Sequence, residues 1–125
     1  MNKLTPELLV EDIVDSVKFY TDVLGFEVSV QFPEDNPFFA IIKNDAVEIM
    51  LYERKPFADE IPEMREKPMG GSVALYIDLQ DVIKLHNDIK DKVQIVQELH
   101  ETTYNTQEFS CKDLNGYVLM FAQSK

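Results

Sequence analysis

The chain has 125 residues, 45% of them hydrophobic, and its 23 acidic and 12 basic residues give a formal net charge of -11. This composition is typical of one soluble domain, and we expect a cytoplasmic protein without a membrane partner because no long apolar run or signal-like start is present. Nucleic-acid binding is excluded, since it needs clustered Lys and Arg. The charge would favour a cationic ligand, although surface carboxylates that maintain solubility are the commoner explanation.

The chain repeats itself, because residues 5–23 align with residues 74–92 at a constant offset of 69. Each copy begins with alternating apolar residues, which is the pattern of a half-buried strand, and continues with apolar residues at helical spacing. Asp12 and Asp81 lie at the junctions, where a carboxylate can accept hydrogen bonds from free helix amides. Gly25 ends the first predicted helix.

The remainder of each copy predicts three strands separated by turn-forming residues. In chain order these strands cover residues 26–32, 38–43, 47–53, 93–99, 107–112 and 117–123. The turn before the last strand contains Asn115-Gly116, and both residues tolerate positive φ. Each copy is therefore βαβββ.

One domain over residues 1–125 is predicted, with module one at residues 4–53 and module two at residues 72–123. Residues 54–71 are charged and contain three prolines, so we interpret them as a connector with at most a short helical turn near residues 61–66. The single cysteine, Cys111, excludes an internal disulfide and is expected to be a small buried apolar residue.

The order of motifs is similar to that of a known family over almost the whole chain. The motifs are residues 8–12 (LLVED), 24–26 (LGF), 75–82 (LYIDLQDV) and 113–123 (DLNGYVLMFAQ). Together they resemble the glyoxalase/bleomycin resistance/extradiol dioxygenase group, the vicinal oxygen chelate superfamily, and residues 99–123 are most similar to its bleomycin-resistance-type branch. The resemblance implies an α+β fold in which two tandem βαβββ modules form one curved mixed sheet with helices on its convex face. It also implies a homodimer.

The family's metal enzymes hold a divalent ion with ligands on the first, fourth, fifth and eighth strands. Carried over to this chain, these positions fall on Thr5, Glu48, Ala74 and Met120. Only Glu48 could ligate, and a single carboxylate would hold the ion too weakly for a catalytic site. The resemblance therefore predicts no metal and no cofactor. His86, on the second predicted helix, and His100, just past a strand, are not at ligand positions.

Strand alternation places a mostly apolar and aromatic set of side chains on the concave face, and nearby aromatic residues could add walls. The predicted ligand-binding groove consists of Phe39, Glu48, Met50, Tyr52, Tyr76, Tyr104, Phe109 and Met120. For each aromatic residue, ordinary packing in the core or in a dimer interface is the alternative. For Glu48 the alternatives are a neighbouring hydroxyl partner, partial exposure or contact with a ligand cation.

The sequence favours a metal-free small-molecule-binding protein that sequesters a cationic or amphipathic organic ligand. The alternative is a divalent-metal-dependent lyase, isomerase or dioxygenase of the same superfamily, with an unusual ligand set such as Glu48 with His100 or Glu7. A metal-free enzyme that uses Glu48 as a general acid or base is a third interpretation, but no second catalytic group is evident.

Overall fold

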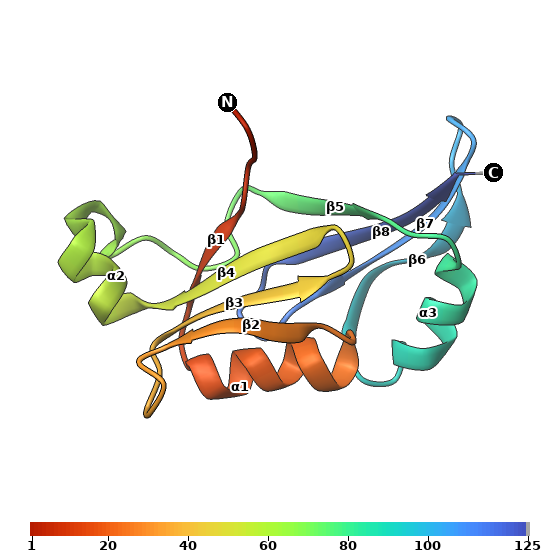
Figure 1. Cartoon of the computed structure of the whole chain (residues 1–125). Helices are drawn as coiled ribbons and strands as arrows, with labels where there is room; N and C mark the ends of the chain where they lie inside the picture. The colour runs from red at the N-terminus through yellow and green to blue at the C-terminus, as the bar shows by residue number, and fades with distance from the viewer. Residues whose placement is uncertain (125) are drawn as a thin grey trace. The chain divides into compact units, whose positions relative to one another are not determined.

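The computed structural model describes residues 1–124 and confirms the two tandem βαβββ modules (Figure 1). The chain divides into two compact units, the first covering Met1–Met69 and the second beginning at Gly70. Each unit carries its own four-stranded mixed sheet, with the same order of elements in both. The single domain predicted over residues 1–125 stays a prediction.

The first unit contains four strands and two short helices, followed by a turn of 3-10 helix. Its elements are β1 (Glu7–Val10), α1 (Ile13–Lys18), the π-helical turn η1 (Phe19–Val23), β2 (Glu27–Phe32), β3 (Phe39–Asn44), β4 (Val47–Glu53), α2 (Arg54–Glu60) and η2 (Pro62–Met64). The strand order is β1-β4-β3-β2, with β1 parallel to β4 and the other pairs antiparallel. The helix α1 contacts β3 and β4 on one face of this sheet.

The second unit repeats this arrangement. Its elements are β5 (Ala74–Asp78), α3 (Val82–Ile89), β6 (Gln94–Glu101), β7 (Thr106–Lys112) and β8 (Val118–Ser124). The strand order is β5-β8-β7-β6, again with only the first and last strands of the module parallel. The helix α3 contacts β7 and β8.

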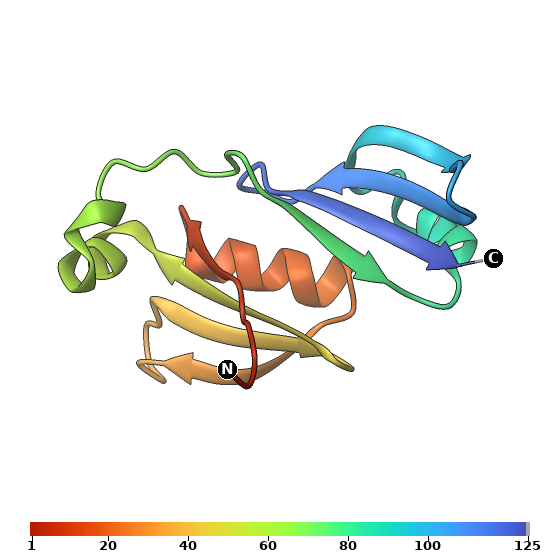
Figure 2. The ribbon, with the colours of Figure 1, turned by 90° about the horizontal axis from the view of Figure 1, so that it is seen from above.

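The hydrogen bonding differs from the predicted single sheet. In residues 1–124 the strands pair as two four-stranded sheets, each within its own module (Figure 2). In each module the last strand is inserted between the first and third strands, as β4 is between β1 and β3. Both edges of that central strand are therefore satisfied inside the module.

The predicted helix starts are confirmed. The side chain of Asp12 accepts a hydrogen bond from the Asp15 amide at 3.0 Å, and Asp81 accepts one from the Lys84 amide at the same distance. Gly25 has φ 73° after η1, which is the left-handed conformation expected of a residue that follows a helix.

A second capping contact in each unit comes from the end of the last strand. The Glu53 carboxylate accepts a hydrogen bond from the Ile13 amide at 2.8 Å, and Gln123 Oε1 accepts one from the Val82 amide at 3.0 Å. Each contact satisfies an amide at a helix N-terminus, where no intrahelical partner exists. It also fixes the helix to the strand that closes its module.

The cores lie between each helix and its sheet, as strand alternation predicts. Ile49 and Leu51 are buried under α1, and Leu119 and Phe121 are buried in the second unit. Cys111 is also fully buried, and burial raises the pKa of its thiol to about 12. The cysteine is therefore a core residue, as expected.

The turn before β8 differs in detail from its prediction. Gly116 adopts φ 89°, but Asn115 does not have a positive φ. The turn is held instead by the Asp113 carboxylate, which accepts hydrogen bonds from the amides of Asn115 and Tyr117 at 2.9 and 3.0 Å. An aspartate that bonds to its own following backbone stabilises a turn in this way.

The predicted helical turn in the connector is confirmed as η2 (Pro62–Met64), which lies within residues 61–66. The sequence missed a second helix, because α2 begins at Arg54, directly after β4. The cause is a tertiary contact, because Phe57 is buried and stacks on Tyr52 of β4 with ring centroids 4.6 Å apart. Arg54 then donates hydrogen bonds to the carbonyls of Met64, Arg65 and Lys67, which holds the connector against α2.

We predict that Gln123→Ala lowers the free energy of unfolding by about 1–2 kcal/mol, because the Val82 amide loses its acceptor. Gln123→Glu keeps an acceptor oxygen and should stay close to the wild type. Urea denaturation measures both, with Gln94→Ala on β6 as an exposed control. An equal loss in the Ala and Glu variants would contradict the capping role.

Candidate functional site

The sheet face opposite α1 in the first unit carries half of the predicted groove residues. The register places Glu7 beside Met50, and Tyr52 beside both Leu9 and Phe39. Cross-strand partners point to the same side of a sheet, so these residues share a face. The helix α2 covers one end of it through the stack of Phe57 on Tyr52.

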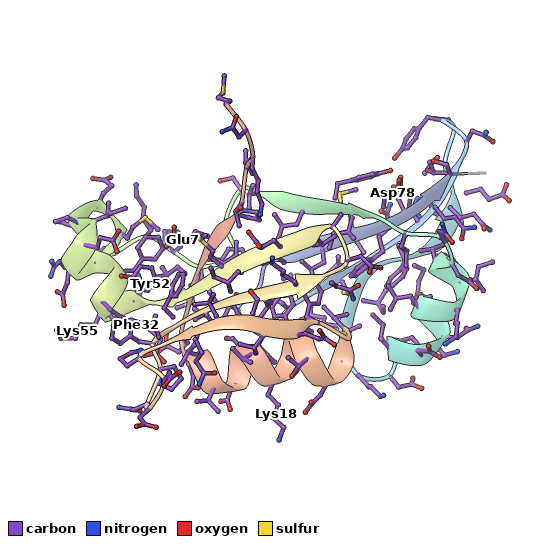
Figure 3. The ribbon with its side chains drawn as sticks, in the orientation of Figure 1. Glu7, Lys18, Phe32, Tyr52, Lys55 and Asp78 are labelled. Atoms are coloured by element: carbon purple, nitrogen blue, oxygen red, sulfur yellow. The ribbon has the colours of Figure 1, made fainter. Side chains whose placement is uncertain are left out.

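This face contains an open hollow of about 530 Å³, which we call the aromatic hollow. Its lining residues are Glu7, Val30, Phe32, Phe38, Phe39, Met50, Tyr52 and Glu60. Glu7, Phe32 and Tyr52 are labelled together near α2 in Figure 3. Three predicted groove residues, Phe39, Met50 and Tyr52, therefore line one hollow. A second hollow of about 490 Å³ follows residues 62–67, but no aromatic side chain lines it.

The aromatic rings of the hollow form a connected wall. Phe38 and Tyr52 are nearly parallel, with centroids 6.2 Å apart and planes at 11°. Phe32 meets Phe38 edge-on at 5.8 Å, and Phe39 meets Tyr52 edge-on at 5.3 Å. Such contacts fix the orientation of the rings, so the hollow has an ordered aromatic wall of the kind that suits a flat or amphipathic molecule.

Two carboxylates give the aromatic hollow its charge. Partial burial, together with the negative charge of Glu60, raises the pKa of Glu7. The Tyr52 hydroxyl donates a hydrogen bond to Glu60 at 2.7 Å, which with partial burial raises the pKa of Tyr52 to about 12. The described residues that line the hollow include no Lys or Arg. The hollow is therefore both aromatic and anionic.

Glu48 does not line the aromatic hollow, although it was predicted in the groove. Its carboxylate is 2.6 Å from Lys3 Nζ and 3.2 Å from Lys43 Nζ, and the Thr5 hydroxyl donates to it at 3.4 Å. The hydrogen bonds from Lys3 and then Lys43 lower the pKa of Glu48. The Thr5 hydroxyl is the neighbouring hydroxyl partner that was one of the sequence alternatives, but the two ammonium groups, which the sequence did not predict, are closer.

The residues at the family's metal positions do not fit a divalent ion. Glu48 is already compensated by two lysines, and the threonine beside it replaces an imidazole. In the second unit Ala74 and Met120 offer no nitrogen or carboxylate ligand. In residues 1–124 no group of three or more His, Cys, Asp or Glu side chains is arranged to hold a metal.

The second unit contains a buried carboxylate that sequence reasoning missed. Glu108 of β7 is 1% exposed and accepts hydrogen bonds from the hydroxyls of Tyr76 (2.7 Å), Thr106 (2.9 Å) and Tyr104 (3.1 Å). We call these four residues the hydroxyl-caged carboxylate. The signal was alternation, because Phe109 and Cys111 are apolar and core-facing, which leaves Glu108 on the opposite face.

Two predicted groove residues, Tyr76 and Tyr104, therefore contact the same carboxylate, and Met120 lies beside Tyr76 in the register. Burial acts to raise the pKa of Glu108, but the hydrogen bonds from Tyr76, Thr106 and Tyr104 outweigh it and leave that pKa below its usual value. The carboxylate is consequently ionised at neutral pH.

The placement of Phe109 in the groove is wrong. Phe109 is fully buried, stacks on Phe121 at 5.3 Å and meets the His86 ring of α3 at 5.0 Å. Because Phe109 is paired with Phe121 across β7 and β8, both side chains point toward the helix. His86 thus has the core-edge position expected, with its Nε2 3.3 Å from Glu98. His100 lies within β6 rather than past it.

Comparisons with known proteins agree with this architecture. Residues 3–121 match the model of the Glyoxalase/Bleomycin resistance protein/Dioxygenase superfamily. The chain is 30% identical over 95 residues to the uncharacterized protein YraH of Bacillus subtilis (strain 168), covering 74% of this chain and 73% of that protein.

Solved structures show the same fold. A protein of unknown function from Agrobacterium tumefaciens str. C58 has a TM-score of 0.81 at 22% identity, covering 100% of this chain and 95% of that one. The bleomycin-binding protein of Streptomyces verticillus, solved with copper(II)-bleomycin, has a TM-score of 0.68 at 18% identity, covering 100% and 98%.

Membrane crossing by a helix is not supported for residues 1–124. No helix in this part of the chain combines the length and the apolar character needed to span a bilayer.

We predict that Phe109→Ala lowers the free energy of unfolding by about 3–5 kcal/mol, because it leaves a cavity beneath α3. Phe32→Ala is the matched control, since Phe32 is 59% exposed and its loss should cost less than about 1 kcal/mol. Urea denaturation of both variants makes the comparison. Similar losses of stability in the two variants would indicate that Phe109 lies on the surface of a groove and not in the core.

Proposed function

The chain belongs to the glyoxalase/bleomycin resistance protein/dioxygenase superfamily, and we propose that it is a metal-free small-molecule-binding protein. The ligand is a cationic or amphipathic organic molecule held in the aromatic hollow. The observation that carries this proposal is the lining itself, which combines Phe and Tyr rings with Glu7 and Glu60 and has no Lys or Arg among its described residues.

The physical basis is complementarity to an organic cation with an apolar body. Aromatic faces attract cations, and the attraction strengthens when water is excluded. The cation would lie between Glu7 and Glu60, where it would lower the electrostatic cost of holding two carboxylates near each other. The apolar body would contact Phe38, Phe39 and Met50. The copper(II)-bleomycin complex of the Streptomyces verticillus protein is a precedent for organic ligand binding on this fold.

The rival proposal is a divalent-metal-dependent lyase, isomerase or dioxygenase. It would need Glu48 as a ligand, together with His100 or Glu7. The ion pairs of Glu48 with Lys3 and Lys43 weigh against it, because a metal ion would have to displace both ammonium groups. Use of Glu48 as a general acid or base meets the same difficulty, since the lysines favour its ionised form.

The homodimer and the cytoplasmic location implied by the sequence stay predictions.

We predict that protein purified without chelators contains far less than one equivalent of Ni, Zn, Mn or Fe. The physical reason is that Thr5, Ala74 and Met120 replace the ligands of the family's metal enzymes. Plasma emission spectroscopy of the dialysed protein measures the content. A stoichiometric ion that survives dialysis would favour the enzyme over the binding protein.

We predict that Glu7→Gln weakens binding of an arylalkylamine such as 4-phenylbutylamine roughly tenfold, as expected for the loss of a partly desolvated charge pair. The neutral counterpart 4-phenylbutanol should bind both proteins equally. Isothermal titration calorimetry measures all four affinities, with Glu27→Gln on β2 as an exposed control. Amine affinity that is unchanged by Glu7→Gln would remove Glu7 from the site.

The same substitution should stabilise the ligand-free protein at neutral pH. The pKa of Glu7 is higher in the folded state than in the unfolded state, so the folded state favours the protonated form. The stability that the protonated Glu7 carboxyl contributes is present at low pH, and it is lost as the pH rises through the pKa of Glu7 in the folded state. Glutamine imitates the protonated form, so Glu7→Gln should raise the melting temperature at pH 7 and change it less at pH 4. Glu7→Gln should thus weaken amine binding and, at pH 7, raise the stability of the ligand-free protein.

A further inference from the structure

We propose that the hydroxyl-caged carboxylate of the second unit is a second binding site, for a compact organic ammonium ion. The site consists of Glu108, Tyr76, Tyr104 and Thr106. None of these residues lines the aromatic hollow, so the inference does not depend on the function proposed for that hollow.

Glu108 carries a negative charge that is not paired with a Lys or Arg side chain in residues 1–124. Its three hydroxyl donors satisfy hydrogen-bonding capacity but bring no positive charge. The same chain treats Glu48 differently, because Lys3 and Lys43 both lie within 3.2 Å of it. The hydroxyl donors keep Glu108 ionised without neutralising it, so its negative charge can still attract a cationic ligand.

The charge is reinforced by its surroundings. Asp78, Ala122, Glu108 and His100 are consecutive partners across the second sheet, so they form one row on the same face. Asp78, labelled in Figure 3, adds a second carboxylate to this row. His100 is the single basic side chain in the row; its Nδ1 donates to the Glu98 carbonyl at 2.8 Å, and its charge adds to the hydrogen bonds that lower the pKa of Glu108.

The cover over Glu108 consists of movable side chains. Tyr76 is 53% exposed and Tyr104 is 63% exposed, while the carboxylate beneath them is 1% exposed. Rotation of an exposed aromatic side chain is fast and does not require the sheet to open. A small cation can therefore reach Glu108 by displacing one phenol.

The two carboxylate oxygens differ in how easily they accept a new donor. Oε2 accepts two hydrogen bonds, from Tyr76 at 2.7 Å and from Thr106 at 2.9 Å. Oε1 accepts the longer bond, 3.1 Å, from Tyr104, and has capacity for another donor. We therefore assign Oε1 as the position that receives the ammonium group, and Tyr104 as the group that competes with it.

The size of the ligand follows from the neighbouring residues. The tyrosine rings supply faces for a cation, and Met120 supplies a small apolar surface beside Tyr76. This set suits a primary ammonium ion with a short alkyl chain. A large amphipathic molecule would instead find its apolar surface in the aromatic hollow.

The test is a titration with n-butylammonium chloride, followed by NMR of the tyrosine side chains. Saturable shifts are expected at Tyr76 and Tyr104 with butylammonium but not with n-butanol. Glu108→Gln should weaken binding at least about tenfold. Glu98→Gln, which removes an exposed carboxylate of β6, is the matched control and should leave the affinity unchanged. Absence of saturation, or equal shifts with butanol, would overturn the proposal.

Tyr104→Phe provides the decisive variant, and it keeps the test valid if Glu108→Gln fails to fold. It removes the hydroxyl that occupies Oε1 but keeps the ring, so butylammonium should bind more tightly, by about threefold or more. A purely structural cage would give unchanged or weaker binding, and either result would refute the assignment. Phe39→Ala, which alters only the aromatic hollow, should leave the shifts at Tyr76 intact. Loss of the Tyr76 shifts in this variant would show that butylammonium binds in the aromatic hollow, and it would contradict a separate site.

Discussion

The hydrogen bond that the first amide of each helix donates to a side chain at the end of its module's last strand is the contact that joins helix to sheet in both units. The Ile13 amide donates to Glu53, and the Val82 amide donates to Gln123. In both units the first and last strands are parallel, and the helix follows the first strand directly. The contact joins each helix to the strand ladder whose register places Glu7 beside Met50, and Tyr76 beside Met120. Both candidate sites follow from that register.

Local patterns in the sequence predicted the modules, the helix caps and the core, because alternation and capping are properties of short segments. They could not predict α2, since its position depends on Phe57 packing against Tyr52. Phe109 was misplaced although a local signal was present. It lies two residues before Cys111, which was expected to be buried, so alternation puts both on the core face, where Phe109 pairs with Phe121. Phe39, Met50 and Tyr52 were predicted in the groove, and all three line the aromatic hollow. The hydroxyl cage around Glu108 was not predicted, because its side chains come from separate elements.

The chain accommodates carboxylates on its strands in three different ways. Glu48 is paired with lysines, Glu108 is surrounded by hydroxyls, and the pKa of Glu7 is raised by partial burial and by the negative charge of Glu60. The first arrangement is complete without a ligand. The other two have no Lys or Arg ion pair among the described residues, and both lie next to aromatic rings. This contrast, more than the overall acidity, is what points to cationic ligands.

The helix α2 lies outside the two repeated modules, yet it contributes Glu60 and the ring stacked on Tyr52 to the surroundings of the aromatic hollow. The pairing of the sheets does not involve this segment. Substitutions or changes of length in residues 54–60 could therefore alter which molecules fit the hollow while the duplicated scaffold stays as it is. In evolution, as in engineering, specificity and stability would then be adjustable in separate parts of the chain.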